Sequence, residues 1–195
     1  IKKSQVSGNC FNTAIVSTYS LVYTGGYSGG LLDANGDIHF VPYSATVGQK
    51  VSASGTVSTY SLVYTTASGY FGGVLSYNGD IHFVPYGASV GQKISINGTI
   101  STYSLIGSRF YYGGILAPNG EIHFISDGVI QKISTNLVLS TYSVPSNTNF
   151  YGAILTSDGT VHMVPSTSPR GQKLNFQSAV NFSPALCQSP YFNKL

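Results

Sequence analysis

Four histidines recur along the chain and are the first residues that could do chemistry. Their spacings are 43, 41 and 39 residues, and each stands between apolar neighbours, as in Ile38-His39-Phe40. Neutral imidazoles that converge on one ion within about 2.1 Å would make a metal site. The same placement in every repeat favours a structural histidine, hydrogen-bonded between neighbouring strands, with ligand contact as a further interpretation. The four are His39, His82, His123 and His162. We predict no metal site and no cofactor.

Acidic residues follow the same spacing, two positions before three of the histidines. Paired carboxylates can hydrolyse glycosidic bonds, but these acids are expected just after turns in different repeats, where solvated acids are common. No nucleophile elbow, phosphate-binding glycine loop or Cys/His metal spacing is found. The sequence therefore predicts no catalytic residue and a chain that is not an enzyme. The acids are Asp37, Asp80 and Glu121, and Thr160 takes their place in the fourth repeat.

A Gln-Lys pair also recurs once per repeat. A ring of its lysines could bind sulfated or acidic glycans, and a solvated strand face is the alternative interpretation. The pairs are Gln49-Lys50, Gln92-Lys93, Gln131-Lys132 and Gln172-Lys173.

Aromatic residues are the strongest candidates for ligand binding. One of them occupies an aligned position where the chain enters the first strand of each repeat. A tyrosine offers an apolar ring face and a hydroxyl at small entropic cost, and a repeated rim of such sites favours multivalent binding. Packing between repeats is the alternative. The candidate ligand-binding residues are Tyr27, Tyr70, Tyr111, Phe150 and Tyr191. Their entry loops are expected to share one rim with the loops at 43–46 and 86–89.

Three independent markers share a period near 41 residues, so the chain is a repeat protein. They are the histidines, the Gln-Lys pairs and Thr-Tyr-Ser, which occurs at 18–20, 59–61, 102–104 and 141–143. Each repeat contains four short runs typical of strands. Asn-Gly or Asp-Gly separates the first two, which predicts a two-residue type I′ hairpin. No segment has a helical period.

Four antiparallel strands per repeat predict an all-β fold, a β-propeller of four-stranded blades. The repeats span about 17–57, 58–100, 101–139 and 140–177, in a single domain 1–195. The termini, 1–16 and 178–195, resemble parts of a further repeat: Ala179-Val180-Asn181-Phe182-Ser183 matches a fourth strand. We expect them to form a fifth, closing blade. A four-bladed ring with accessory ends and a section of a longer propeller are the alternatives.

The two cysteines, Cys10 and Cys187, lie one in each terminal segment. A disulfide between them would lock the closure of a ring, and two buried thiols are the alternative. Such a disulfide would indicate an extracellular or virion setting.

Composition excludes several classes of protein. Charged residues make up only 8% of the chain and the net charge is +3, too weak and scattered for nucleic-acid binding. No apolar run reaches the roughly 20 residues that span a bilayer, so no membrane insertion is expected. A hydrophobic fraction of 42% argues against disorder.

The repeat Gly-Gly-Val-Leu-x-x-Asn-Gly-Asp-Ile-His-Phe-Val-Pro, followed by Gly-Gln-Lys-Ile-Ser and Ser-Thr-Tyr-Ser-Leu-Val-Tyr, resembles propeller repeats of phage and other viral tail-fibre and structural proteins. The resemblance covers 17–177. It implies a non-enzymatic virion component or host-recognition module, located in the virion or outside the cell. Its partners would be other virion proteins or cell-surface glycans. The architecture also resembles five-bladed tachylectin-type lectins, so a secreted sugar-binding lectin is the alternative function. The oligomeric state stays open.

Overall fold

The computed structural model describes residues 16–107, 110–126, 128–144, 150–167 and 169–176, to which all structural statements below refer. They contain four antiparallel sheets and no helix. The first sheet has β1 (Tyr27–Leu32), β2 (Ile38–Pro42), β3 (Val47–Val51) and β4 (Val57–Ser61). The second has β5 (Tyr70–Leu75), β6 (Ile81–Pro85), β7 (Val90–Ile94) and β8 (Ile100–Ser104). The third has β9 (Gly113–Leu116), β10 (Ile122–Ile125), β11 (Val129–Ile133) and β12 (Leu139–Ser143). The fourth has β13 (Phe150–Leu155), β14 (Thr160–Pro165) and β15 (Lys173–Asn175).

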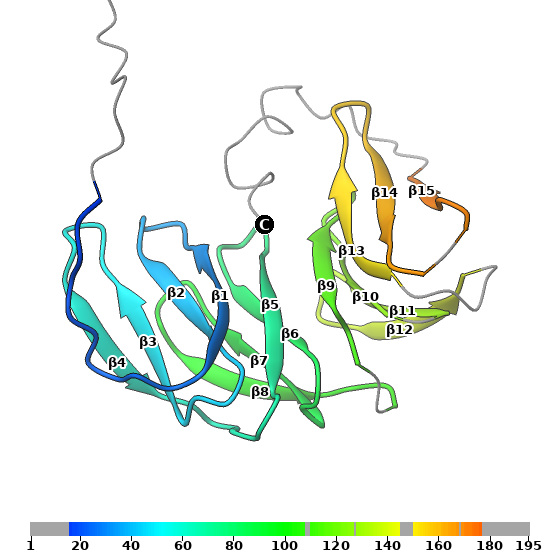
Figure 1. Cartoon of the computed structure of the whole chain (residues 1–195). Helices are drawn as coiled ribbons and strands as arrows, with labels where there is room; N and C mark the ends of the chain where they lie inside the picture. The colour runs from blue at the N-terminus through cyan, green and yellow to red at the C-terminus, as the bar shows by residue number, and fades with distance from the viewer. Residues whose placement is uncertain (1–15, 108–109, 127, 145–149, 168, 177–195) are drawn as a thin grey trace, which may run out of the picture.

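Each sheet is a meander in which strands pair in the order of the sequence. The first strands of successive sheets contact one another, β1 with β5, β5 with β9 and β9 with β13. The sheets thus follow one another in a row, with the first and the fourth at opposite ends (Figure 1). This arrangement confirms the all-β prediction and is propeller-like.

The hairpins between the first two strands of a sheet differ from the predicted type I′ turn. In the second sheet the N–H of Ser76 donates to the carbonyl of Asp80 (2.9 Å), and the N–H of Gly79 donates to the carbonyl of Ser76 (3.0 Å). Gly79 has φ 83°, whereas Asn78 is not among the residues with positive φ. A type I′ turn needs positive φ at both central residues. The two-residue prediction is therefore wrong, and the loop is a longer turn that closes on a left-handed glycine.

Apolar packing between sheets forms the core. We name the face of a sheet that meets the next sheet along the chain its forward face, and the other its reverse face. At the first junction, Leu31 and Val41 on the forward face pack with Tyr70, Ile81 and Phe83 on the reverse face of the second sheet. Equivalent clusters fill the second and third junctions. The alternation of side chains along each strand sends successive residues to opposite faces.

The recurring glycine pair is explained by these junctions. A Cβ built on Gly73 would lie 2.9 Å from a methyl carbon of Leu31, and one built on Gly114 would lie 2.6 Å from a methyl carbon of Val74. An aliphatic side chain of the forward face thus occupies the space that a side chain would need on the next sheet. At the third junction Ala153 stands in this position and packs in one cluster with Ile115.

In the first three sheets the glutamine of the Gln-Lys pair holds the linker that enters its sheet. Gln92, which is fully buried, accepts hydrogen bonds through Oε1 from the N–H groups of Val63 (3.0 Å) and Tyr64 (2.8 Å). Gln49 does the same for Val22 and Tyr23. The Gln-Lys repeat therefore has a structural role, because its glutamine satisfies backbone donors of a segment outside the strands.

Two sequence predictions stay untested. The closing blade formed by 1–16 and 178–195 falls on residues outside the described part, apart from residue 16, and so does the disulfide between Cys10 and Cys187. The described residues 16–21, although they repeat the outer-strand sequence, lie in no strand.

We predict that Gln92→Leu destabilises the chain by about 2 kcal/mol, because two backbone N–H groups lose their acceptor. Urea unfolding followed by far-ultraviolet circular dichroism measures the loss. Thr102→Val is the matched control, since Thr102 faces Gln92 in the neighbouring strand but is exposed. A loss for Gln92→Leu no larger than that of the control would contradict the role assigned to the glutamine.

Candidate functional site

A continuous strip of aromatic side chains runs across the rim that holds the entry loops. Tyr86 is at its centre, with its ring centroid 5.5 Å from that of Phe71, 5.0 Å from Phe110 and 5.4 Å from Tyr112. Tyr43 extends the strip toward the first sheet, 6.1 Å from Tyr86. Tyr151 extends it to the fourth sheet, 5.0 Å from Tyr112. The aromatic strip thus draws on all four sheets.

The strip is accessible, although its rings contact one another. Phe71, Phe110 and Tyr151 keep 44%, 58% and 55% of their surface exposed, and Tyr43, Tyr86 and Tyr112 are half-buried. A contiguous exposed apolar surface on a soluble chain marks an interaction site. The neighbouring loops of the first two sheets, 43–46, 62–69 and 86–89, contain no charged residue. The part of the surface over the first two sheets is therefore suited to neutral, flat groups.

β-bulges direct two of these rings outward. The register between β5 and β6 shifts between Tyr70 and Gly72, and the register between β13 and β14 shifts between Phe150 and Gly152. Phe71 and Tyr151 occupy the extra positions. A bulge re-aims a side chain and is common beside active sites and at barrel rims.

The aromatic residues singled out from the sequence are the direct neighbours of the strip residues. Tyr70, Tyr111 and Phe150 are at most 1% exposed and pack in the cores between sheets. Tyr27 is half-buried and donates its hydroxyl proton to the carbonyl of Val47 (3.0 Å). Tyr191 lies outside the described residues. Their ligand contact stays a prediction, but the three buried rings present no surface to a ligand. In the second and fourth sheets the exposed aromatic, Phe71 or Tyr151, is the second residue of the first strand.

The histidines of the first three sheets pair with the tyrosine of the outer strand. Nδ1 lies 3.2 Å from the Tyr60 hydroxyl for His39, 3.3 Å from Tyr103 for His82 and 2.9 Å from Tyr142 for His123. These histidines are buried, whereas His162 in the fourth sheet is exposed. No described group of three or more His, Cys, Asp or Glu side chains could hold a metal ion. The geometry supports a structural histidine.

The acids and lysines of the repeats pair with one another. Lys50 Nζ lies 2.7 Å from Asp37, Lys93 lies 2.6 Å from Asp80, and Lys132 lies 2.8 Å from Glu121. The hydrogen bond from Lys50 lowers the pKa of the Asp37 carboxyl. Burial alone would raise the pKa of Asp80, but the bonds from Lys93 and the Ile96 N–H outweigh it and lower the pKa. These lysines are therefore engaged within their own sheets.

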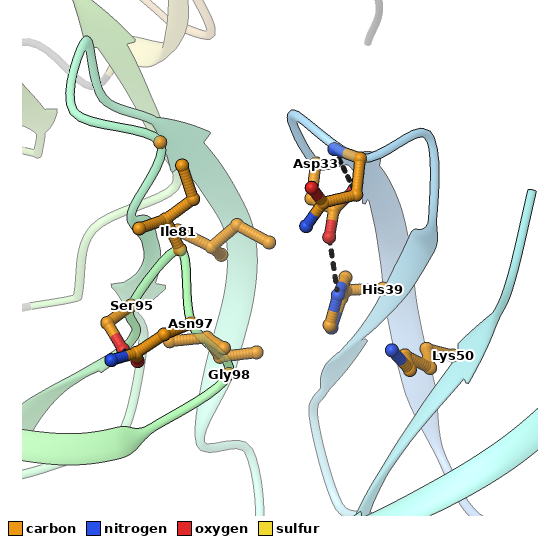
Figure 2. A pocket seen from close by; sticks show the side chains of 11 residues that line it. Asp33, His39, Lys50, Ile81, Ser95, Asn97 and Gly98 are labelled. Atoms are coloured by element: carbon orange, nitrogen blue, oxygen red, sulfur yellow. Dashed lines mark hydrogen bonds and ion pairs between the residues drawn. The ribbon is translucent and has the colours of Figure 1, made fainter.

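A cavity of about 200 Å³ lies between the first and second sheets, at the rim opposite the strip. Asp33, His39 and Lys50 line one side, and Ile81, Ser95 and Asn97 line the other (Figure 2). His39 Nε2 lies 3.4 Å from Asp33 Oδ2, and this carboxylate also accepts the N–H groups of Asn35 and Asp37. Both ring nitrogens of His39 thus face protein partners, Asp33 and the Tyr60 hydroxyl.

Comparisons with known proteins show the fold. No family model and no curated protein sequence matches. Among solved structures, a streptogramin B lyase is 20% identical with a TM-score of 0.65, over 80% of this chain and 56% of that one. An inactive histidine-to-alanine variant of virginiamycin B lyase from Staphylococcus aureus with quinupristin is 19% identical, with a TM-score of 0.64 over 79% and 57%. The extracellular domain of a one-component system from B. thetaiotaomicron is 13% identical, with a TM-score of 0.60 over 76% and 20%. The chain thus spans about half the length of the lyases that it matches.

These matches correct the functional expectation. The predictions of a virion component, of a lectin and of a chain that is not an enzyme are contradicted, because the similar structures are lyases and bacterial binding or extracellular proteins. Regular repeats and few charges specify the scaffold, and one scaffold carries many functions. Neither feature therefore excludes catalysis. An extracellular domain among the matches agrees with the coarser expectation of an extracellular protein. The described residues contain no helix long and apolar enough to cross a membrane.

We predict that the chain loses stability as the pH falls from about 6.5 toward 4. Burial lowers the pKa of His82 and of His123 from 6.5 to about 4. In this range the unfolded chain therefore binds protons that the folded chain does not, which favours unfolding. Urea midpoints at pH 7 and pH 5 measure the loss, and His82→Gln should make it smaller. Between pH 7 and 8 the midpoint should stay constant. An equal loss in wild type and variant would show that His82 is not its source.

Proposed function

We propose that the chain binds a neutral ligand with one or more flat rings, and that the aromatic strip is the binding surface. The observation that carries this proposal is the unbroken series of ring contacts from Tyr43 through Tyr86 and Tyr112 to Tyr151. Aromatic pairs prefer offset-stacked or edge-to-face geometry, so exposed rings of the strip offer both faces and edges to an incoming ring.

Polar groups next to the strip would orient such a ligand. Tyr64 shares a hydrogen bond with Ser89 (3.0 Å), and Tyr23 shares one with Thr46 (3.1 Å). These hydroxyls stand on loops of the same rim. Binding sites for small molecules combine apolar walls with a few such polar groups. The lyase structure with quinupristin supports an organic, ring-bearing ligand only as an analogy of fold.

The proposal predicts that the chain binds N-acetyl-tryptophanamide and quinupristin but not N-acetyl-leucinamide, which has no ring. The chain contains no tryptophan, so the fluorescence anisotropy of the indole reports its binding directly. Calorimetry measures the other two probes. Tyr86→Ala should weaken binding roughly five- to tenfold, because one aromatic contact contributes about 1 kcal/mol.

Tyr77→Ala is the matched control, since Tyr77 is 48% exposed but lies in a turn at the opposite rim. Its affinity should equal that of the wild type. Chromatography of the quinupristin samples shows whether the probe is converted. Absence of binding to both ring-bearing probes, or equal loss in the two variants, would overturn the proposal.

A further inference from the structure

The fourth sheet has three strands in the described chain, whereas each of the others has four. Among the described residues, no strand pairs with the outer edge of its last strand, β15. Such an edge is a template for another strand. In the other sheets this position is filled by an outer strand with the sequence Ser-Thr-Tyr-Ser.

The same sequence occurs a fourth time, in a segment that has no sheet. Residues 16–21 read Val-Ser-Thr-Tyr-Ser-Leu, identical to 57–62, but they form no strand and are exposed. Tyr19 is 61% exposed and Val16 is 91% exposed. The next residues, Val22 and Tyr23, are held by Gln49 in the way that Gln92 holds the residues after β4. Residues 16–21 thus stand where the outer strand of a preceding sheet would end.

Among the described residues, no side chain occupies the place of this tyrosine in the fourth sheet. A Cβ on Gly48 would overlap the ring of Tyr60, and a Cβ on Gly91 would lie 2.1 Å from the ring of Tyr103. Gly171 is the equivalent glycine of the fourth sheet, and nothing lies within 4 Å of its Cβ position. His162 is exposed, whereas the equivalent histidines contact the tyrosine of an outer strand. A tyrosine bound at this place would therefore contact His162.

The chain that follows β15 does not provide that tyrosine at the required distance. In the first three sheets the tyrosine comes ten residues after the lysine of the Gln-Lys pair, as Tyr60 follows Lys50. The tenth residue after Lys173 is Ser183, and the segment 179–183 that matches a fourth strand has Phe182, not tyrosine, nine residues after Lys173.

The forward face of the fourth sheet and the reverse face of the first sheet also have the complementary residues of an internal junction. Ile154 and Val164, on the forward face of the fourth sheet, are 52% and 40% exposed, whereas their equivalents Val74 and Val84 are buried. On the reverse face of the first sheet, Ile38 is 42% exposed and Gly30 is also exposed. Gly30 is aligned with Gly73 and Gly114, which receive aliphatic side chains at the internal junctions. Ile154 is the equivalent of Leu31 and Val74 in the fourth sheet. The described chain has no further sheet against which Ile154 could pack.

We propose that two copies of this chain assemble head to tail, and that residues 16–21 of each copy form the missing outer strand beside β15 of the other. Ile154 of one copy then packs over Gly30 of its partner, which continues the internal junctions. The two ends lie at opposite ends of the row of sheets (Figure 1), and Gln49 holds the donor segment at the first. A second copy therefore fits better than the chain's own first segment.

The number of sheets agrees with a closed assembly. The chain matches 56% of the streptogramin B lyase chain, so its four sheets correspond to about half of that structure. Two copies would bring together eight sheets, within the range of about four to eight blades seen in propellers. Two identical head-to-tail contacts between the described sheets close on themselves by twofold symmetry.

The register between the third and outer strands indicates which two residues of the two copies would lie opposite each other. A disulfide between these residues tests the proposal. Lys50 pairs with Ser58, Lys93 with Ser101 and Lys132 with Ser140, so Lys173 should face Ser17 of the second copy. Opposed residues of antiparallel strands are close enough for a disulfide. We would mix a Ser17→Cys chain with a larger, tagged Lys173→Cys chain, both with Cys10→Ser and Cys187→Ser, and oxidise the mixture. The expected product is the covalent heterodimer.

The control replaces Leu174 instead of Lys173, because the side chain of the next residue points to the opposite face of the sheet. It should cross-link much less. Light scattering under reducing conditions should give twice the chain mass of 20.6 kDa for the wild type, and Gly171→Val or Ile154→Asp should shift the protein to the monomer. Val63 is also exposed, at 58%, but it lies outside the proposed contact, so Val63→Asp should leave the protein a dimer.

A wild type that stays monomeric at about 100 μM would overturn the proposal. So would a double-cysteine chain, Ser17→Cys with Lys173→Cys, that forms its disulfide only within one chain. The second result would show that the first segment closes the ring of its own copy.

Discussion

The packing of an aliphatic side chain over a glycine of the next sheet is the contact on which the rest of the structure depends. Leu31 over Gly73 and Val74 over Gly114 bring the first strands of neighbouring sheets close together. Because these strands approach closely, the larger side chains farther out, such as Phe83 and Phe124, are fully buried between the sheets. Buried apolar area of this kind is the main source of stability in a folded chain.

Polar residues that recur from repeat to repeat also stabilise the arrangement of the strands. The buried glutamine holds the linker, the histidine contacts the outer-strand tyrosine, and the lysine pairs with the acid of the hairpin. Each of these contacts lies within one repeat or joins a repeat to the linker that enters it. A buried polar group needs such partners, which explains why the same residue types return in at least three of the four repeats.

Much of the fold could be predicted from the sequence, because its markers repeat with one period. Alternating apolar residues such as Ile81 and Phe83 indicate strands, and Asn78-Gly79 indicates a hairpin, though of a different turn type. The candidate site was harder to predict. The bulge at Phe71 moves the exposed ring to the residue after the buried Tyr70, and strict alternation contains no information on such an insertion. The exposure of Ile38 and Ile154 depends on their place at the ends of the row, which identical repeats do not reveal.

The meander within each sheet also has a consequence for how the chain folds. Every strand pairs with its neighbour in sequence, so contacts within a sheet close short loops, unlike the distant pairings of most β-sandwiches. Local contacts favour fast folding. Each sheet gains its remaining stability from adjacent sheets only, as in a one-dimensional array. Within a single chain, the second and third sheets have a neighbour on both sides and are therefore its cooperative centre, so we expect opening to begin at the two ends.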